Sequence, residues 1–397
     1  MLALYGLGTT IGAGIYALIG EVAGVAGVYA PLSFLIAAIM AGLTAFSFAE
    51  LSSRYPQSAG EAHYVQEAFG LRSISTLIGM LVIFAGVVSA AAVVNAFVGY
   101  LHEFIIVPPR IAIIAIIAIL GAVAAWGIAE SVVVASVVTV IEIGGLMMIV
   151  WAGSGEFIRL PEVLPGIISD FRWEFFPGLM AGTVLAFFAF IGFEDIVNVA
   201  EEAKNPRRIL PLAIIITLVV TTIVYLAVSI VSVLAVPLEE LAAHDAPLAL
   251  IYERSTGQSA DLLSVIGIVA VLNGALVQII MASRVLYGLS AKGMLPSILS
   301  TVNTYTQTPL YATALVVGIV FVLALGFDLA GLAKSTSIIT LCIFALVNAA
   351  LIRIRLRDKF SSLKEGIEKI ESVQYPLIIP ILGLLVSVVF LGIGLFG

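Results

Sequence analysis

Residues 8–16 read Gly-Thr-Thr-Ile-Gly-Ala-Gly-Ile-Tyr and lie inside an apolar segment of the chain. The stretch holds three glycines within seven residues, and each weakens a helix by roughly 1 kcal/mol relative to alanine. In lipid, an unpaired backbone amide or carbonyl costs several kcal/mol, so a broken helix survives there only around a polar cavity or a bound ligand. The stretch therefore predicts an interrupted membrane helix that borders a binding site.

A second apolar segment, residues 176–203, contains another candidate break. Its residues 187–194 read Phe-Phe-Ala-Phe-Ile-Gly-Phe-Glu. Two interrupted spans that lie far apart in a sequence point to the substrate site of a secondary transporter built from inverted repeats. The pair of breaks therefore predicts a carrier.

The composition is that of a polytopic membrane protein. The 397-residue chain is 61% hydrophobic and 11% charged, whereas soluble domains carry about 25% charged residues. A span needs ~20 apolar residues, and we count eleven such segments. They cover residues 1–23, 29–53, 73–104, 110–128, 131–152, 176–200, 209–236, 260–290, 309–327, 330–352 and 375–396. The net charge of −7 and the lack of a basic stripe argue against a nucleic-acid partner.

The distribution of lysine and arginine predicts the orientation. Thirteen of the eighteen fall on the side of the amino terminus when the loops alternate, which predicts a cytoplasmic amino terminus. We expect one transport domain in the plasma membrane. Residues 1–152 and 176–352 would form two halves of opposite topology, because each holds an odd number of spans. Residues 353–397 would follow as a cytoplasmic segment and an extra helix.

Four stretches of the chain resemble the amino acid–polyamine–organocation family of transporters, and they look most like its cationic-amino-acid and broad-range permeases. The first is residues 8–16, and the third is residues 187–194 with 201–211. The second and fourth consist of Glu50, Leu51, Tyr55, Pro56, Ser58, Gly60, Tyr64, Phe69 and Gly70, and of Asn273, Arg284, Tyr287, Gly293 and Pro296. The resemblance thus extends from residue 8 to residue 296.

The resemblance implies an all-α polytopic fold of the leucine-transporter type. This fold has a core of two inverted five-helix repeats, in which helices 1 and 6 are broken. The family usually adds two further helices, whereas this sequence shows one, which makes about eleven. Met1 stands only about seven residues before the first break, so we expect helix 1 to lack a normal cytoplasmic half.

The break in helix 1 is expected to bind a substrate carboxylate. Exposed amides and the positive end of the outer half-helix suit an anion. The amides concerned are those of Ile11, Gly12, Ala13 and Gly14. The alternative is that these glycines only allow close helix packing.

The break in helix 6 is expected to bind the other end of the substrate. Unwinding would free carbonyls near Phe187, Phe188 and Ile191 to accept from an α-ammonium group. The resemblance puts Phe188 where the family often has an aromatic gate over the substrate. Gly192 has no side chain and would admit a bulky substrate group. The alternative for the phenylalanines is contact with lipid.

Glu142 is the residue expected to couple transport to protons. Its segment resembles the family's fifth helix, where many members have a lysine whose ammonium takes the place of a sodium ion beside helix 1. A glutamate at this position suggests a carboxyl group that gains and loses a proton during the cycle. The alternative is a carboxyl group without a coupling role.

Two further polar residues are assigned to coupling or gating. Glu194 matches the family's acidic position in helix 6, and an ionised group at membrane depth is costly enough to indicate function. We expect Glu194, and not the adjacent Asp195, to face the helix bundle. Asn273 on helix 8 would line the cavity, with an ordinary interhelical hydrogen bond as the alternative.

Charged residues also gather at the expected inner surface. Glu50 and Arg54 end helix 2 there, and Arg284 and residues 201–208 are candidates to pair with them. Such residues would form either ion pairs of an inner gate or a solvated charge cluster.

These observations predict a secondary amino acid transporter that works by alternating access, uses protons and carries neutral or broad-range substrates. The neutral preference rests on the lack of a clear carboxylate on helices 3 and 8. An amino acid exchanger and a polyamine carrier of the same fold are the alternatives. The sequence shows no nucleophile or metal-ligand constellation of an enzyme. We expect no metal or cofactor, and the expected partners are an amino acid, protons and the lipid bilayer.

Overall fold

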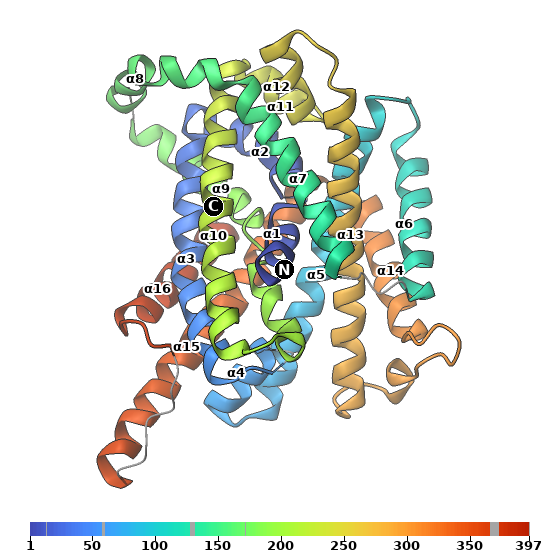
Figure 1. The fold of residues 1–397 in the computed structure, drawn as a ribbon, viewed down its shortest axis with the longest axis vertical. Helices are drawn as coiled ribbons and strands as arrows, with labels where there is room; N and C mark the ends of the chain where they lie inside the picture. The colour runs from blue at the N-terminus through green and yellow to red at the C-terminus, as the bar shows by residue number, and fades with distance from the viewer. Residues whose placement is uncertain (13, 58–59, 128–131, 171, 366–372, 397) are drawn as a thin grey trace.

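The computed structural model describes residues 1–12, 14–57, 60–127, 132–170, 172–365 and 373–396, and its regular elements there are all helices (Figure 1). The first half contains α1 (Leu2–Ile11), α2 (Gly14–Ala26), η1 (Gly27–Tyr29), α3 (Ala30–Arg54), α4 (Gly60–Phe69), α5 (Arg72–His102), α6 (Pro109–Trp126), α7 (Val132–Ala152) and α8 (Ser154–Ser169). The second contains η2 (Trp173–Phe175), α9 (Phe176–Phe188), η3 (Phe193–Glu202), α10 (Pro206–Ala235), α11 (Leu238–Ala243), α12 (Pro247–Thr256), α13 (Asp261–Ala291), η4 (Ser297–Ser300), α14 (Leu310–Gly326), α15 (Leu329–Glu365) and α16 (Ile378–Phe396).

The protein is a multi-pass membrane protein. By length and hydropathy, eight helical runs of the described chain can cross a membrane, or nine if α7 and α8, bent by 60°, form one broken span. The count of nine is lower than the eleven predicted segments for two reasons. It joins Leu2–Arg54 into one run, and it leaves out the shorter apolar helix Leu310–Gly326. Each of the eleven predicted segments overlaps at least one helix of the structure.

The surface of the spanning helices suits a lipid environment. Large apolar side chains such as Ile39 and Ile119 are exposed, whereas soluble monomers rarely expose extensive apolar surface. The three tryptophans, Trp126, Trp151 and Trp173, are exposed at or near helix ends. Amphipathic rings prefer that depth, at the boundary between lipid and water.

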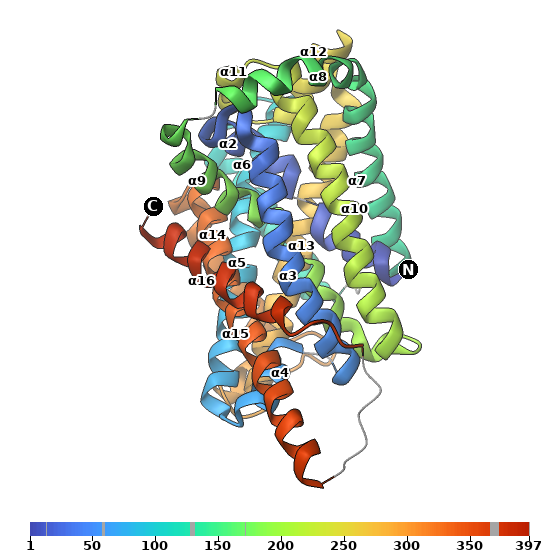
Figure 2. The ribbon, with the colours of Figure 1, turned by 90° about the vertical axis from the view of Figure 1, so that its left-hand side faces the viewer.

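The helices form one upright bundle with short helices across its two ends. Figure 2 shows α8, α11 and α12 at one end and α4 at the other. The most extensive contacts join α5 to α13 and α15, and α3 to α10. The broken helices lie among these long ones, since α1 packs on α7 and α10 while α9 packs on α2, α3 and α15.

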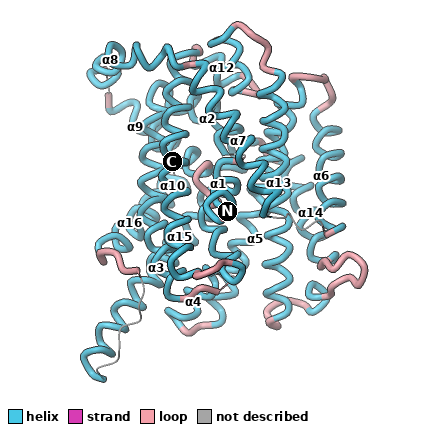
Figure 3. Tube along the Cα trace, viewed as in Figure 1, coloured by secondary structure: helices cyan, strands magenta, loops and turns pink. Residues whose placement is uncertain are grey.

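Both predicted breaks are present. The first helix ends at Ile11 and resumes as α2 at Gly14. The second span ends its α-helix at Phe188, passes through a turn and continues as the 3₁₀ helix η3 from Phe193. Most other connections lie at the ends of the bundle, whereas Figure 3 shows a loop segment near α1 at mid-height. The bundle therefore has irregular backbone at its centre, as the glycines predict.

Candidate functional site

The two breaks lie against each other. The Thr9 hydroxyl donates a hydrogen bond to the Gly192 carbonyl oxygen at 2.9 Å. From α10, the Tyr225 hydroxyl shares its proton between the carbonyl oxygens of Thr10, at 2.8 Å, and Ala189, at 3.0 Å. One buried side chain thus satisfies carbonyls from both interrupted helices, which removes a cost that the lipid interior would otherwise impose.

Two glycines allow this close approach. A Cβ atom added to Gly14 would lie 2.5 Å from Ala189 Cα, and one added to Gly192 would lie 2.5 Å from the Thr9 carbonyl oxygen. Gly192 also has a φ angle of +125°, which residues with a side chain rarely adopt. The sequence suggested that Gly192 makes room for substrate. The structure gives it a different role, because the space beside it is filled by the backbone of α1.

A small cavity of about 30 Å³ lies at the junction of the breaks. Its lining includes Thr9 and Gly14 on one side and Phe188 and Ile191 on the other, so it brings together residues from both predicted binding segments. Walls from α5 and α13 close it. Among the other predicted residues, Ile11 is buried at the end of α1, and Ala13 lies outside the described residues.

Two of the three predicted carbonyl acceptors in the second break, those of Phe187 and Phe188, keep a backbone hydrogen bond. The Phe187 carbonyl accepts from the Phe190 amide at 3.0 Å, and the Phe188 carbonyl accepts from the Ile191 amide at 3.1 Å. A carbonyl oxygen has a second lone pair, so these groups can still accept from a ligand. The Phe187 ring is buried edge-on against Phe344, with the ring centroids 5.6 Å apart.

Glu142 lies at the first break. It is fully buried on α7, and its Oε1 accepts a hydrogen bond from Asn273 Nδ2 of α13 at 3.2 Å. A Cβ atom placed on Gly12 would be 3.7 Å from the same oxygen. Two of the residues assigned to coupling or gating from the sequence, Glu142 and Asn273, are therefore partners beside the break.

Two tyrosines extend the polar network around Glu142. The Tyr16 hydroxyl donates to the Glu142 carbonyl oxygen at 2.7 Å, and the Tyr100 hydroxyl donates to the Tyr16 carbonyl oxygen at 2.8 Å. The network links α5, α2, α7 and α13. Tyr16 is the last residue of the glycine-rich stretch 8–16. No local signal identified Tyr100, whose partner Tyr16 is 84 positions away, or Tyr225, whose nearer partner Ala189 is 36 positions away.

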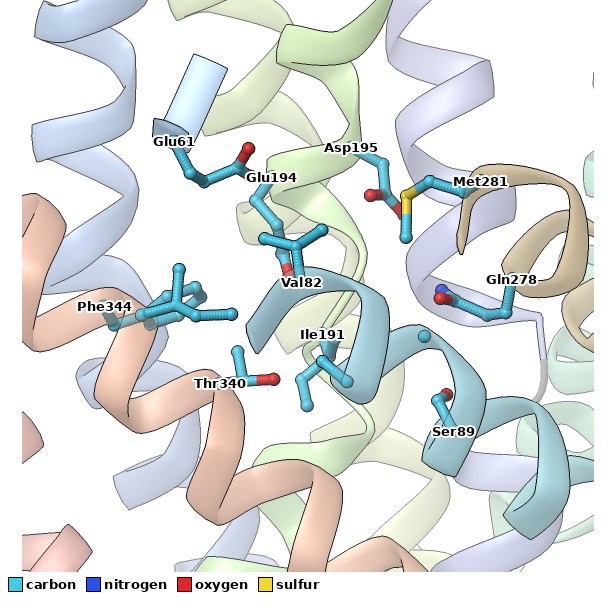
Figure 4. A pocket seen from close by; sticks show the side chains of 13 residues that line it. Glu61, Val82, Ser89, Ile191, Glu194, Asp195, Gln278, Met281, Thr340 and Phe344 are labelled. Atoms are coloured by element: carbon cyan, nitrogen blue, oxygen red, sulfur yellow. The ribbon is translucent and has the colours of Figure 1, made fainter. Parts of the chain in front are cut away.

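A second cavity, also of about 30 Å³, adjoins the first and shares Ser89, Ile191 and Gln278 with it. Glu194 and Asp195 of η3 both line it (Figure 4). The expectation that only Glu194 faces the bundle is therefore wrong. Both residues stand in the first turn of η3, and the cavity is wide enough at this point for both side chains to line it. Glu194 Oε2 also accepts from the Gly192 amide at 2.9 Å.

A third carboxyl group on this cavity was not identified from the sequence. Glu61 of α4 is buried and lines the same wall as η3. It stands among polar residues of a loop, where a glutamate would ordinarily be solvated. Its burial follows from the packing of α4 against α5 and α15.

The expected ion pairs at the end of α3 are present, but among the described residues Arg54 and Glu50 take partners from α15 and not from Arg284 or residues 201–208. Glu50 is fully buried and accepts hydrogen bonds from Arg54 Nη2 at 2.8 Å and from Arg355 Nε at 2.7 Å. Arg54 Nη1 also contacts Asp358 Oδ2 at 2.6 Å. We call Glu50, Arg54, Arg355 and Asp358 the Glu50 cluster. The helix that supplies the partners is α15.

Comparison with known proteins finds relatives that are named as transporters and permeases. The chain is 32% identical to the vacuolar cationic amino acid transporter 2 of Arabidopsis thaliana, over 93% of the chain and 62% of the relative. It is 30% identical to the branched-chain amino acid permease BcaP of Bacillus subtilis, over 90% of the chain and 80% of the relative. It is 28% identical to the methylthioribose transporter of the same bacterium, over 89% of the chain and 80% of the relative.

The chain spans about 60% of the length of the Arabidopsis transporters that it matches. The model of the amino acid permease family matches residues 2–397, and the relatives are named as transporters and permeases. The chain therefore belongs to the amino acid permease family, a family of membrane transporters and not of enzymes.

Proposed function

We propose that the chain carries amino acids by alternating access and that Glu142 carries a proton with them. The substrate backbone would bind at the first cavity, between the positive end of α2 and the carbonyls of the turn after α9. Helix termini and unwound backbone are the usual means by which carriers of this architecture hold charged groups. Both cavities are small, so a substrate enters when the bundle opens.

The pair formed by Glu142 and Asn273 carries this proposal. The Glu142 carboxyl group reaches the break where the substrate carboxylate would bind, as its position beside Gly12 indicates. Two negative charges at such short range repel strongly where water is scarce. A proton on Glu142 removes that repulsion, so proton and substrate favour each other's binding. Asn273 would hold the carboxyl group in place.

We propose the same arrangement of repeats and the same membrane orientation that the sequence predicts. Two inverted halves, residues 1–152 and 176–352, would rock around the central site in the plasma membrane, with the amino terminus in the cytoplasm. The lysine and arginine distribution supports this orientation. A substrate range from neutral to broad agrees with relatives whose names mention cationic and branched-chain amino acids.

Glu142→Gln is expected to uncouple uptake from the proton gradient. Glutamine retains the size and the hydrogen bond to Asn273 but cannot carry a proton, so exchange of amino acids continues while accumulation is lost. The measurement is uptake of radiolabelled amino acids into proteoliposomes, with and without an acidic exterior. Glu103→Gln, at the end of α5 outside the cavities, serves as the matched control. Gradient-driven accumulation by Glu142→Gln at the wild-type level would contradict the proposal.

A second candidate, exchange of cationic amino acids, is favoured by the three carboxyl groups on the second cavity. A side chain that extends from the first cavity through the shared wall would meet Glu194 and Asp195. Competition separates the candidates. Lysine and leucine should both inhibit uptake by a broad-range carrier, whereas only lysine should inhibit a cationic exchanger. A polyamine, which has no carboxylate, should inhibit neither.

A further inference from the structure

Three carboxyl groups meet on the second cavity from two elements that are distant in sequence. Glu61 comes from α4, a short helix at one end of the bundle, whereas Glu194 and Asp195 come from η3. Figure 4 shows them around one space, with Asp195 beside Met281 of α13. All three are at least nine-tenths buried. Carboxyl groups so placed cannot all be ionised, because each charge would lack water and face another negative charge.

Two polar atoms on this cavity have no hydrogen-bond partner within the part of the chain that the structure describes. They are Asp195 Oδ2 and Thr340 Oγ1, in residues that are 4% and 2% exposed. Native proteins rarely keep buried polar atoms without partners. The cavity volume of about 30 Å³ is enough for one water molecule. A water in this cavity would supply a hydrogen-bond partner to a lining atom of this kind.

Four arginines of α15 and α5 are directed away from the three carboxyl groups. On α15, Arg353 donates to the Ala68 carbonyl oxygen, Arg357 donates to the Glu67 carbonyl oxygen, and Arg355 pairs with Glu50. On α5, Arg72 donates to the Lys292 carbonyl oxygen. Glu61 acts electrostatically on Glu194, and both act on Asp195. A proton on one of these carboxyl groups removes part of that repulsion.

We propose that Glu61, Glu194 and Asp195 form a second proton-binding site, separate from Glu142, in which a water molecule joins the carboxyl groups of α4 and η3. This site goes beyond the proposed function, which assigns one proton to Glu142. Because α4 closes one end of the bundle, a proton at Glu61 stands between the central cavities and that end. The site would make transport depend on the pH of the α4 side.

Burial raises the pKa of Glu61 from its ordinary value of 4.5 to about 7. A group whose pKa is raised on folding adds its full stabilisation below the unfolded value, and this is lost as the pH rises through the folded value. The contribution of Glu61 to the free energy of unfolding is therefore complete below about pH 4.5 and is lost as the pH rises to about 7. Glutamine mimics the protonated form and removes this dependence.

The test compares melting temperatures of the purified protein in detergent from pH 4.5 to pH 8.5. The wild type should lose several degrees relative to Glu61→Gln as the pH rises, and the two curves should meet at the acidic end. Glu67→Gln, on the same helix but off the cavity, should follow the wild type. Parallel curves for wild type and Glu61→Gln would overturn the proposal. No transport is needed, so this result is independent of the proposed function.

A spectroscopic measurement covers the case in which Glu61→Gln folds poorly. The infrared carbonyl band of a protonated carboxyl group should be present in the wild type at pH 6. Asp195→Asn and Thr340→Val should shift or weaken the band that belongs to this site, while Glu142→Gln leaves it in place. A band that responds only to Glu142→Gln would show that the second cavity holds no proton.

Discussion

Glu50→Ala is expected to destabilise the folded protein by about 3–5 kcal/mol, the range for breaking a buried ion pair by removing one partner. Glu50 is fully buried, and it accepts hydrogen bonds from Arg54, Arg355 and the Tyr375 amide. Without its carboxylate, two guanidinium groups would face each other in a space closed to water. The loss would detach α15 and the segment before α16 from the end of α3.

The measurement is thermal stability in detergent, followed by the fraction of protein that stays monodisperse after heating. Glu50→Gln keeps the side-chain volume, and its thermal stability should be nearly as low as that of Glu50→Ala. The missing charge, and not the missing atoms, causes the loss. Asp358→Asn is the matched control within the Glu50 cluster. Its side chain is 48% exposed, and exposed pairs contribute about 0–1 kcal/mol. Equal losses for Glu50→Gln and Asp358→Asn would refute this account.

Gly192→Ala is expected to abolish transport. The new methyl group would stand 2.5 Å from the Thr9 carbonyl oxygen and 3.0 Å from the Thr10 amide nitrogen. Both are backbone atoms, which cannot move aside as a flexible side chain can. The φ angle of +125° adds strain, and residues held in such regions cost about 1–3 kcal/mol each. The two breaks would separate, and the cavity between them would lose its shape.

Uptake and binding by Gly192→Ala can be compared with Gly288→Ala, on α13, where an added Cβ would meet open space. Alanine in a helix interior is more favourable than glycine by about 0.5–1 kcal/mol, so the control should be active and no less stable. Wild-type uptake by Gly192→Ala would mean that the approach of the two breaks is not needed for transport.

The fold was largely predictable because its determinants are local. A membrane penalises exposed backbone everywhere, so apolar length alone identifies the spans, and glycine content locates the break at residues 8–16. The sequence predicted that Glu142 and Asn273 belong to one site, but it did not predict the hydrogen bond between them. The contact itself depends on how α7 and α13 rotate against each other.

The features that the sequence did not predict depend on contacts between residues that are distant in the chain. Arg355 replaces the predicted partners of Glu50 because α15, and not the loop after η3, packs beside α3. Glu61 gave no sign of burial, since a short polar segment reveals nothing about the helices that cover it. Asp195 was assigned to the wrong side because the sequence shows where a helix breaks but not the path of the turn that follows.

Tyr225 has a mechanical consequence for a carrier of this kind. Its hydroxyl holds the ends of both interrupted helices to α10, so a tilt of α10 moves both ends together. The two ends and α10 would then move as one unit. A substrate gripped at its two charged ends would keep the same grip throughout the stroke, and only the walls around it would part and close.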